Sequence, residues 1–454
     1  MRSWPAFAYL SRQSAAPGDF VEVHSLSWGA LRFSVERLGR TRTTVLSDEV
    51  GPRGGVQTAP DATPDLQCPL GWPIVWGFAV DGRFQGGLHV LVALDCAGNR
   101  TEQPFVVVGG SASILVVLPT LTWHLYNFWG GRSRYYAPEH PFGGERRTAT
   151  GPRSRGLRQW VPVCAKRLIR SRFGGEPLKG SFVTRPLTTR RPFQFRSFGD
   201  SPELPYCSHL AAADWRLCAW LEREGVNCSF CTETSLTAAL RESCRRAVVL
   251  GSHAEYWPRE PFHALATAHR DLGCWLLNFG GNAMFEQTEF VTPTETICMR
   301  SRFRTTVADE ARLTGVRYRS AGYATAAPYR VVSRRNRLLA GISSDGEFGR
   351  ENLVVGTEVP SDGYDPEFPA VDGRHVPLVG SGASGWELDR RAAAGFEVIA
   401  RGMNPGGGAE MVFRSPARGR GGAFSASSLT FTGSLLVDRG VSRLASRLLQ
   451  EAAG

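Results

Sequence analysis

The chain has 454 residues, of which 42% are apolar and 21% charged, the composition of an ordinary globular protein with room for two or three domains. The net charge of +11 invites a nucleic-acid partner, but only two of the 53 basic residues, Lys166 and Lys179, are lysines, and such a skew indicates coding bias. The densest basic stretch, residues 146–191, has no interleaved aromatic platform, so we expect no nucleic acid to bind.

The N-terminal segment has no apolar core long enough for a signal peptide, and no run of about 18 apolar residues occurs. We therefore expect a cytoplasmic protein without a membrane partner. The ten cysteines are scattered, and only Cys228 and Cys231 are closely spaced. A structural zinc site needs a second such pair or spaced histidines, so buried free thiols are expected instead.

Residues 1–110 are expected to form an antiparallel β-sandwich domain. Short segments such as "DFVEVHSLS", "PIVWGFAV" and "LHVLVALDC" alternate in polarity or are continuously apolar, and Gly, Pro and Asp separate them. No cluster of titratable side chains occurs in this region, so we do not expect it to carry the chemistry.

Residues 111–454 are expected to form an α/β domain. The apolar runs "SILVVLPT", "RAVVLGS" and "CWLLNFGG" are typical of strands buried on both faces of a parallel sheet. Between them, "AAADWRLCAWLEREG" and "REPFHALATAHRDLG" have helical spacing and end at Gly225 and Gly273. This alternation predicts a doubly wound sheet, and after residue 300 we expect β-rich additions and a closing helix.

Polar side chains follow three of the predicted strands. Tyr126 lies in "LTWHLYNFWGG" after the first, His253 and Glu255 in "SHAEYW" after the second, and Asn282 in "GGN" after the third. Because ligands of such sheets bind at the carboxyl ends of the strands, we expect these side chains to share one crevice. Each also has an ordinary explanation, as a core aromatic, a turn histidine, a helix cap or a turn asparagine.

The segments "LPTLTWHLYNFWGG", "VLGSHAEYW" and "LLNFGGN", in this order and spacing, resemble the large (β) subunit of N,N-dimethylformamidase and its relatives. The resemblance continues upstream in "SRQSAAPGDFVEV" and "LGWPIVWGF", and downstream in "LLAGISSDGEFG", "AEMVFRS" and "GGAFSASSLTFTGSLL". It covers most of the chain and depends on the whole series of segments.

The resemblance implies a glutamine-amidotransferase-like α/β domain with a mononuclear iron (Fe³⁺) held by two tyrosines and a glutamate. Carried over by motif, Glu255 is the carboxylate ligand and Tyr126 is one phenolate, whereas His253 and Asn282 support the ligands or polarise the substrate. Such oxygen donors suit a ferric ion, which acts as a Lewis acid on an amide carbonyl. The implied function is hydrolysis of the C–N bond of a small amide, and the expected partners are further copies of the chain and a small subunit.

One departure from the family pattern concerns the second tyrosine ligand. In the family it follows an Arg-Pro pair, but here Leu187 and Phe193 follow the two such pairs, and neither side chain binds a metal. Tyr206 in "ELPYCSH" is the nearest substitute, and Tyr135 and Tyr136 are weaker candidates.

A second departure is Ala254, which stands where the family has an acid and removes a hydrogen-bonding group but no ligand. The leading hypothesis is an iron-dependent amide hydrolase. The alternative is a catalytically degenerate, metal-free relative that acts as a binding or scaffold protein, and the missing tyrosine favours it. A cysteine-dependent hydrolase ranks last, because no cysteine follows an apolar strand on a tight turn.

Overall fold

The computed structural model describes residues 8–26, 29–51, 70–127, 129, 133, 186–193, 198–206, 208–292, 295–299, 304–305, 308–319, 322, 325–359 and 374–454. These residues form a mixed α/β structure of several sheets in which strands outnumber helices. The predicted α/β class is therefore confirmed. The sandwich and amidotransferase-like assignments, and the boundary placed at residue 110, stay predictions.

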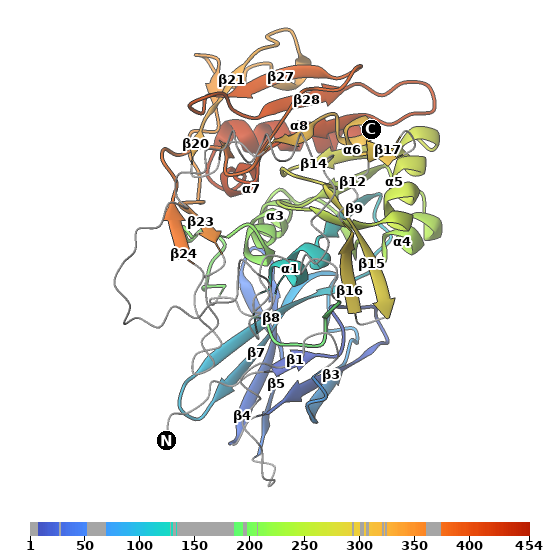
Figure 1. Ribbon diagram of the computed structural model, residues 1–454, viewed down its shortest axis with the longest axis vertical. Helices are drawn as coiled ribbons and strands as arrows, with labels where there is room; N and C mark the ends of the chain where they lie inside the picture. The colour runs from blue at the N-terminus through green and yellow to red at the C-terminus, as the bar shows by residue number, and fades with distance from the viewer. Residues whose placement is uncertain are drawn as a thin grey trace, which may run out of the picture.

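Two sheets lie at the N-terminal end of the chain, coloured blue to cyan in Figure 1. The first has the order β1 (Ala8–Leu10), β3 (Phe20–Ser25), β6 (Ile74–Ala79), and the second has the order β2 (Ser14–Ala15), β8 (Arg100–Val107), β7 (Gly87–Asp95), β4 (Leu31–Leu38), β5 (Arg42–Val50). Apolar side chains of both sheets, among them Val21, Phe33 and Phe105, form one buried core.

Strand β7 is buried on both of its faces. Leu91 and Ala93 belong to the core between the two N-terminal sheets, whereas Leu88, Val90 and Val92 belong to a core that includes α3 (Ala211–Arg223). Successive side chains of a strand point to opposite faces, so one strand contributes to two cores. The five-stranded sheet therefore packs directly against the helix layer of the largest sheet.

The largest sheet has nine strands. Their order is β11 (Cys228–Thr232), β9 (Ile114–Leu118), β12 (Ala247–Leu250), β14 (Trp275–Asn278), β29 (Ala423–Ser425), β28 (Glu410–Arg414), β27 (Glu397–Gly402), β21 (Tyr329–Val331), β22 (Glu347–Phe348). The first five are parallel, and the pairs from β29 onward are antiparallel. By chain order the parallel strands run 2-1-3-4-5, one of the common doubly wound orders, whose switch point for ligands lies between the first and third strands. Here these strands are β9 and β12.

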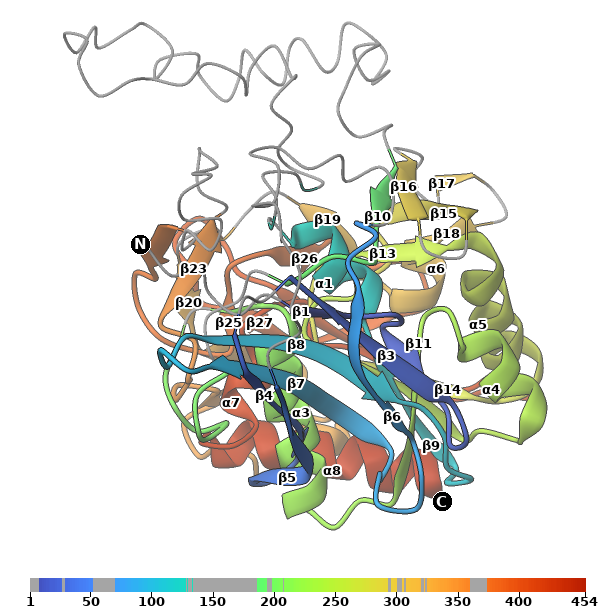
Figure 2. The same ribbon diagram turned by 90° about the horizontal axis from the view of Figure 1, so that it is seen from below.

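Helices cover both faces of the parallel strands. Helix α3 and α8 (Arg439–Ala453) pack on one face with Val116 and Val249. On the other face α4 (Leu236–Glu242) and α5 (Arg259–Asp271) lie side by side (Figure 2) and pack with Leu115 and Val248. This burial explains the continuous apolar runs in the sequence. Both predicted helix ends are confirmed, because the glycines that follow α3 and α5 adopt left-handed backbone conformations.

Smaller elements complete the described chain. A four-stranded sheet has the order β10 (Leu187–Thr188), β16 (Glu295–Met299), β15 (Glu286–Thr292), β13 (Tyr256–Pro258). The remaining elements are α1 (Thr120–Tyr126), β17 (Arg304–Thr305), β18 (Ala308–Asp309), α6 (Glu310–Thr314), β19 (Arg317–Arg319), β20 (Ala326–Ala327), η4 (Arg337–Leu339), β23 (Gly356–Val359), β24 (Arg374–Pro377), β25 (Ser384–Gly385), β26 (Leu388–Arg390) and α7 (Phe431–Ser434). No helix within the described ranges is long and apolar enough to cross a membrane.

The described cysteines only partly match the expected buried free thiols. Cys218, Cys231 and Cys274 are free and buried, as predicted, whereas Cys96 and Cys244 are free and exposed. The close pair in "CSFC" belongs to strand β11 rather than to the start of a helix, where a redox pair is normally found.

Candidate functional site

Tyr126 is the last residue of α1, which begins two residues after β9. A carboxyl group holds the first turn of this helix. Glu233 Oε1 accepts a hydrogen bond from the backbone N–H of Leu121 (3.3 Å), and its Oε2 accepts one from Thr120 Oγ1 (3.2 Å). Glu233 directly follows β11, so the strand next to β9 fixes where α1 starts.

The other end of α1 is held by Arg191, a fully buried cation. Its Nη2 donates hydrogen bonds to the carbonyl oxygens of His124 (3.2 Å) and Asn127 (3.0 Å). Carbonyl groups at a helix C-terminus carry partial negative charge, so a cation there is stabilising. Burial lowers the pKa of Arg191 to about 9, which leaves the side chain charged at neutral pH. Held at both ends, α1 keeps Tyr126 in a defined position.

His253 and Glu255 lie in the turn that follows β12. Asp214 of α3 holds this turn, because its Oδ1 accepts a backbone N–H of the turn at 2.9 Å. A Cβ at Gly251 would lie 2.0 Å from the same oxygen, so this position requires glycine. Thr122 Oγ1 of α1 accepts the backbone N–H of Glu255 (3.1 Å). The helix that carries Tyr126 is therefore joined directly to the turn that carries Glu255.

The carboxylate of Glu255 joins Tyr126 to His253. Tyr126 Oη donates a hydrogen bond to Glu255 Oε2 (2.9 Å), and His253 Nε2 lies 3.3 Å from the same oxygen. His253 Nε2 also lies 3.5 Å from Glu387 Oε2, which accepts a hydrogen bond from Asn282 Nδ2 (2.7 Å). The four residues expected to share one crevice therefore meet, and together with Glu387 they form what we call the carboxylate cluster.

The carboxylate cluster is shielded from water: His253 is 0% exposed, and Glu255 and Glu387 are each 4% exposed. Burial works against the charged form of His253, but the two carboxylates outweigh it and raise the pKa of His253 to about 9. His253 is therefore an imidazolium at neutral pH, with a hydrogen on the Nε2 that faces both carboxylates. Its positive charge offsets the repulsion between two carboxylates buried side by side.

Glu387, which the sequence analysis missed, is placed by a strained turn between β25 and β26. Trp386 has a φ of 67° and Asn282 a φ of 51°, left-handed values that are uncommon outside glycine and are often found at functional sites. The "GGN" loop comes so near that a Cβ at Gly281 would lie 2.9 Å from the carbonyl oxygen of Glu387. In the sequence, the two glycines of "GGN" are the feature that indicates this close approach.

His209, which the sequence analysis also missed, lies two residues before α3. Its ring centroid is 4.6 Å from that of Tyr126, 4.5 Å from that of Trp386 and 5.0 Å from that of His253. Burial, and then the charge of His253, hold the pKa of His209 well below its usual value, so this imidazole is neutral. No periodicity in "CSHLAA" marks the histidine as special.

Tyr206, expected to replace the missing tyrosine ligand, uses its hydroxyl elsewhere. Its Oη donates a hydrogen bond to the carbonyl oxygen of Ala212 (3.0 Å), and the guanidinium carbon of Arg216 lies 4.3 Å from its ring centroid. Burial raises the pKa of Tyr206 to about 12, which disfavours the phenolate that a ferric ion needs. Its assignment as a metal ligand stays a prediction that these contacts do not favour. Tyr135 and Tyr136 lie outside the described residues.

The two other implied ligands, Tyr126 and Glu255, do fit a metal ion. Their oxygens are 2.9 Å apart, close to the separation of about 3 Å between neighbouring ligands that each lie ~2.0–2.1 Å from a small hard cation. A phenol and a carboxylate are also the donors such a cation prefers. No metal-binding group of three or more His, Cys, Asp or Glu residues is found in the described ranges, so a metal site here depends on tyrosine.

Comparison with known proteins agrees with the resemblance seen in the sequence. The family model described as N,N-dimethylformamidase beta subunit-like, C-terminal, matches residues 32–442. The matched range includes the whole carboxylate cluster. A search of the curated proteins gives no match. Because the family model covers most of the chain, the protein belongs to the N,N-dimethylformamidase beta subunit-like family.

Proposed function

We propose that this protein hydrolyses the C–N bond of a small amide with the help of a mononuclear ferric ion held by Tyr126 and Glu255. The observation that carries the proposal is the 2.9 Å contact between Tyr126 Oη and Glu255 Oε2, formed by two segments 129 residues apart in the chain. The family description, which names an amide hydrolase, supports the reaction class.

The chain's own residues supply the proton transfers. When bound, the ferric ion would polarise the amide carbonyl and lower the pKa of a water molecule. Glu387 Oε2 accepts a hydrogen bond from Asn282 and faces the His253 cation, so Glu387 is an anionic base able to take a proton from the attacking water. The water oxygen bonds to the carbonyl carbon, the C–N bond breaks, and the proton held by Glu387 passes to the leaving amine.

The proposal also includes a domain assignment and a set of partners. The 2-1-3-4-5 strand order supports a glutamine-amidotransferase-like domain over residues 111–454, and the shared core of the two N-terminal sheets supports a β-sandwich over residues 1–110. The word subunit in the family description supports an assembly of several copies, with a small second subunit as a further partner. We place the protein in the cytoplasm.

A metal-free binding or scaffold protein remains the second candidate function. Leu187 and Phe193, which stand where the family's second tyrosine is expected, are 7% and 4% exposed and belong to apolar cores. Because these two buried apolar side chains stand in place of the tyrosine, a cation at the site would have only two of the three protein ligands implied by the family. This candidate predicts a purified protein without stoichiometric iron and without amide hydrolysis.

The test of the proposal is metal analysis and amide hydrolysis on one purified sample, with two matched glutamate variants. Glu255→Gln removes the carboxylate ligand and should remove both iron and activity while circular dichroism stays unchanged. Glu451→Gln, a change in a surface ion pair with Arg337, should retain both. Iron retained in Glu255→Gln, or a wild-type protein without iron and activity, would contradict the proposal.

A further inference from the structure

Two arginines, Arg414 and Arg420, lie near each other at the amino ends of β14 and β29. Arg414 is the last residue of β28 and pairs with the first residue of β29, and Arg420 lies in the hairpin between these strands. The hairpin packs against α5, because the N–H of Gly421 donates a hydrogen bond to the carbonyl oxygen of His269 (2.9 Å). The carboxylate cluster lies at the opposite, carboxyl ends of the parallel strands, so the arginines form a separate group.

Only neutral groups hold the guanidinium of Arg414 in the described chain. Its Nη1 donates to the carbonyl oxygen of Arg312 (3.4 Å), and its Cζ lies 4.2 Å from the ring centroid of Phe396. Its Nη2 lies 2.6 Å from Nε2 of His269, whose Nδ1 donates to the carbonyl oxygen of Cys274 (2.9 Å) and so leaves a lone pair on Nε2. Burial and the two arginine charges lower the pKa of His269 to about 4, so this imidazole is neutral at pH 7. Arg414 is therefore fixed in position without being neutralised.

The two arginines have no counter-ion within the described residues. Neither forms an ion pair with an acidic side chain there, and the buried Nε of each has no hydrogen-bond partner. Burial and then the charge of Arg420 lower the pKa of Arg414 to about 10, so Arg414 stays a cation at neutral pH beside a second cation. The terminal amino groups of Arg420 also have no partner in this part of the chain and are open to solvent. Because cations removed from water are normally paired, this group indicates a site for an anion.

We propose that Arg414 and Arg420 bind a phosphate group, either as inorganic phosphate or as the phosphoryl group of a small ester. Guanidinium groups present planar sets of N–H donors that match the oxygens of phosphate, and a phosphate near neutral pH carries enough negative charge to balance both cations. Arg414 is already held by His269 and Phe396, so little conformational freedom is lost when it binds. A ligand that binds only the folded protein stabilises it, so phosphate should raise Tm.

The experiment measures the affinity of the full-length chain for inorganic phosphate by calorimetry, and its Tm in phosphate and in chloride at equal ionic strength. Wild-type protein should bind phosphate and should gain a Tm increase that chloride does not give. Arg420→Gln removes a side chain without a hydrogen bond in the described chain, so the fold should persist while phosphate binds at least about tenfold more weakly. Arg418→Gln removes the same charge from an exposed position of the same hairpin and should bind phosphate like wild type.

A second variant and a second ligand sharpen this test. Arg414→Gln should also weaken phosphate binding at least about tenfold, with its fold checked by circular dichroism. Methyl phosphate in place of inorganic phosphate distinguishes the two sources, because tighter binding of the ester would identify a phosphate ester as the ligand and weaker binding would identify free phosphate. Neither readout involves iron or amide hydrolysis, so the inference stands or fails independently of the proposed function.

Three results would overturn the inference. Arg420→Gln could bind phosphate as tightly as wild type, or chloride could raise Tm as much as phosphate does, which would indicate general charge screening. Self-association of the wild-type protein in phosphate-free buffer, abolished in Arg420→Gln and retained in Arg418→Gln, would show that a carboxylate of a second copy of the chain occupies the site instead.

Discussion

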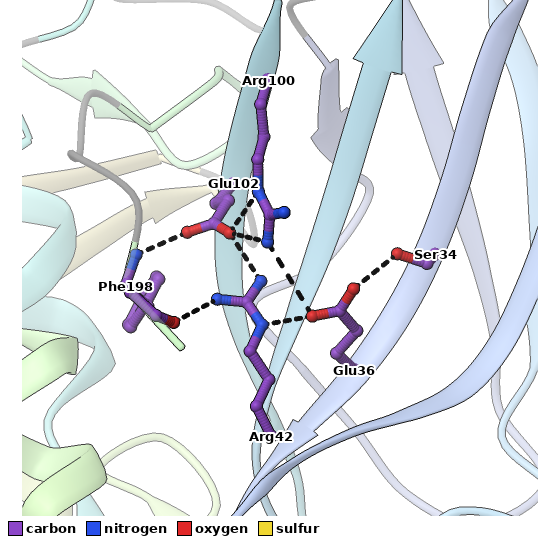
Figure 3. Close-up of polar contacts among 7 residues, drawn as sticks. Ser34, Glu36, Arg42, Arg100, Glu102 and Phe198 are labelled. Carbon is purple, nitrogen blue, oxygen red and sulfur yellow. Dashed lines mark hydrogen bonds and ion pairs between the residues drawn. The ribbon is translucent and has the colours of Figure 1, made fainter. Parts of the chain in front are cut away.

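Two clusters of charged residues, one buried and one partly buried, differ in how fully their polar atoms are paired. In the carboxylate cluster, two carboxylates share one imidazolium, and Asn282 Oδ1 and His253 Nδ1 are left without partners in the described chain. In the N-terminal sheets, Arg42 and Arg100 meet Glu36 and Glu102 (Figure 3). The second cluster balances its charges within itself, whereas the first leaves hydrogen-bonding capacity for a ligand.

The N-terminal cluster also joins separate parts of the chain. Arg42 Nη2 lies 2.5 Å from Glu102 Oε1, and Arg42 Nη1 donates to the carbonyl oxygen of Gly199 at 3.0 Å. Glu102 Oε2 accepts the backbone N–H of Phe198 at 2.6 Å (Figure 3). Residues 198 and 199 lead toward His209 and α3, so these ion pairs fasten the N-terminal sheets to the segment that enters the site. A saturated network of this kind is typical of a structural role.

The largest effect expected from this comparison is loss of activity in Glu387→Gln. The substitution removes the proposed base but leaves an amide of similar shape beside His253 and Asn282. We expect kcat to fall about 10²–10⁴-fold, the usual contribution of a general base, with iron content and thermal stability close to wild type. Steady-state kinetics and metal analysis on the same sample measure this. A kcat equal to that of wild type in the variant would show that Glu387 is not the base.

The second effect concerns stability. Glu102→Ala removes one of the two carboxylates that pair with the buried Arg42, together with the hydrogen bond from the N–H of Phe198 to Glu102 Oε2. We expect the free energy of unfolding to fall by about 3–5 kcal/mol, as measured by urea denaturation. Asp81→Ala, which breaks an exposed pair with Arg83, is the control and should produce no detectable change. A loss below about 1 kcal/mol in Glu102→Ala would show that the network is not structural.

A further effect should appear in the pH dependence of stability. Burial raises the pKa of Glu233 to about 8 from the ordinary 4.5, so the folded protein holds a proton that the unfolded chain releases. The Glu233 contribution to stability is therefore present below pH 4.5 and is lost as the pH rises toward about 8. Urea denaturation at a series of pH values should show a shallower decline in Glu233→Gln than in wild type. Parallel curves would mean that Glu233 is charged throughout.

The sequence predicted those parts of the site that follow directly from strand order. Tyr126 follows β9 and Glu255 follows β12, and both are found at the end where parallel strands present their loops. Glu387 and His209 could not be predicted in this way. Glu387 reaches the cluster through the left-handed backbone of Trp386, and His209 does so through packing against rings distant in the chain. Neither a left-handed backbone conformation nor packing between distant rings produces a periodic pattern in the sequence.

The tyrosine chosen to replace the missing ligand shows the same limit. Its nearness in sequence makes Tyr206 the natural substitute, but Ala212 and Arg216 of α3, six and ten residues further along, engage its hydroxyl and ring. The number of residues between two positions does not determine the direction in which a side chain next to a helix points. The strands and helix ends were predictable because their burial pattern is local, whereas the site is completed by contacts between segments more than 100 residues apart.

The most direct test of the central claim is the visible absorption spectrum of purified wild-type protein beside that of Tyr126→Phe. If Tyr126 binds a ferric ion together with Glu255, wild-type protein will show a tyrosinate-to-iron band that the Phe variant lacks. A band of equal strength in both proteins, or a colourless, iron-free wild-type protein, would contradict the claim.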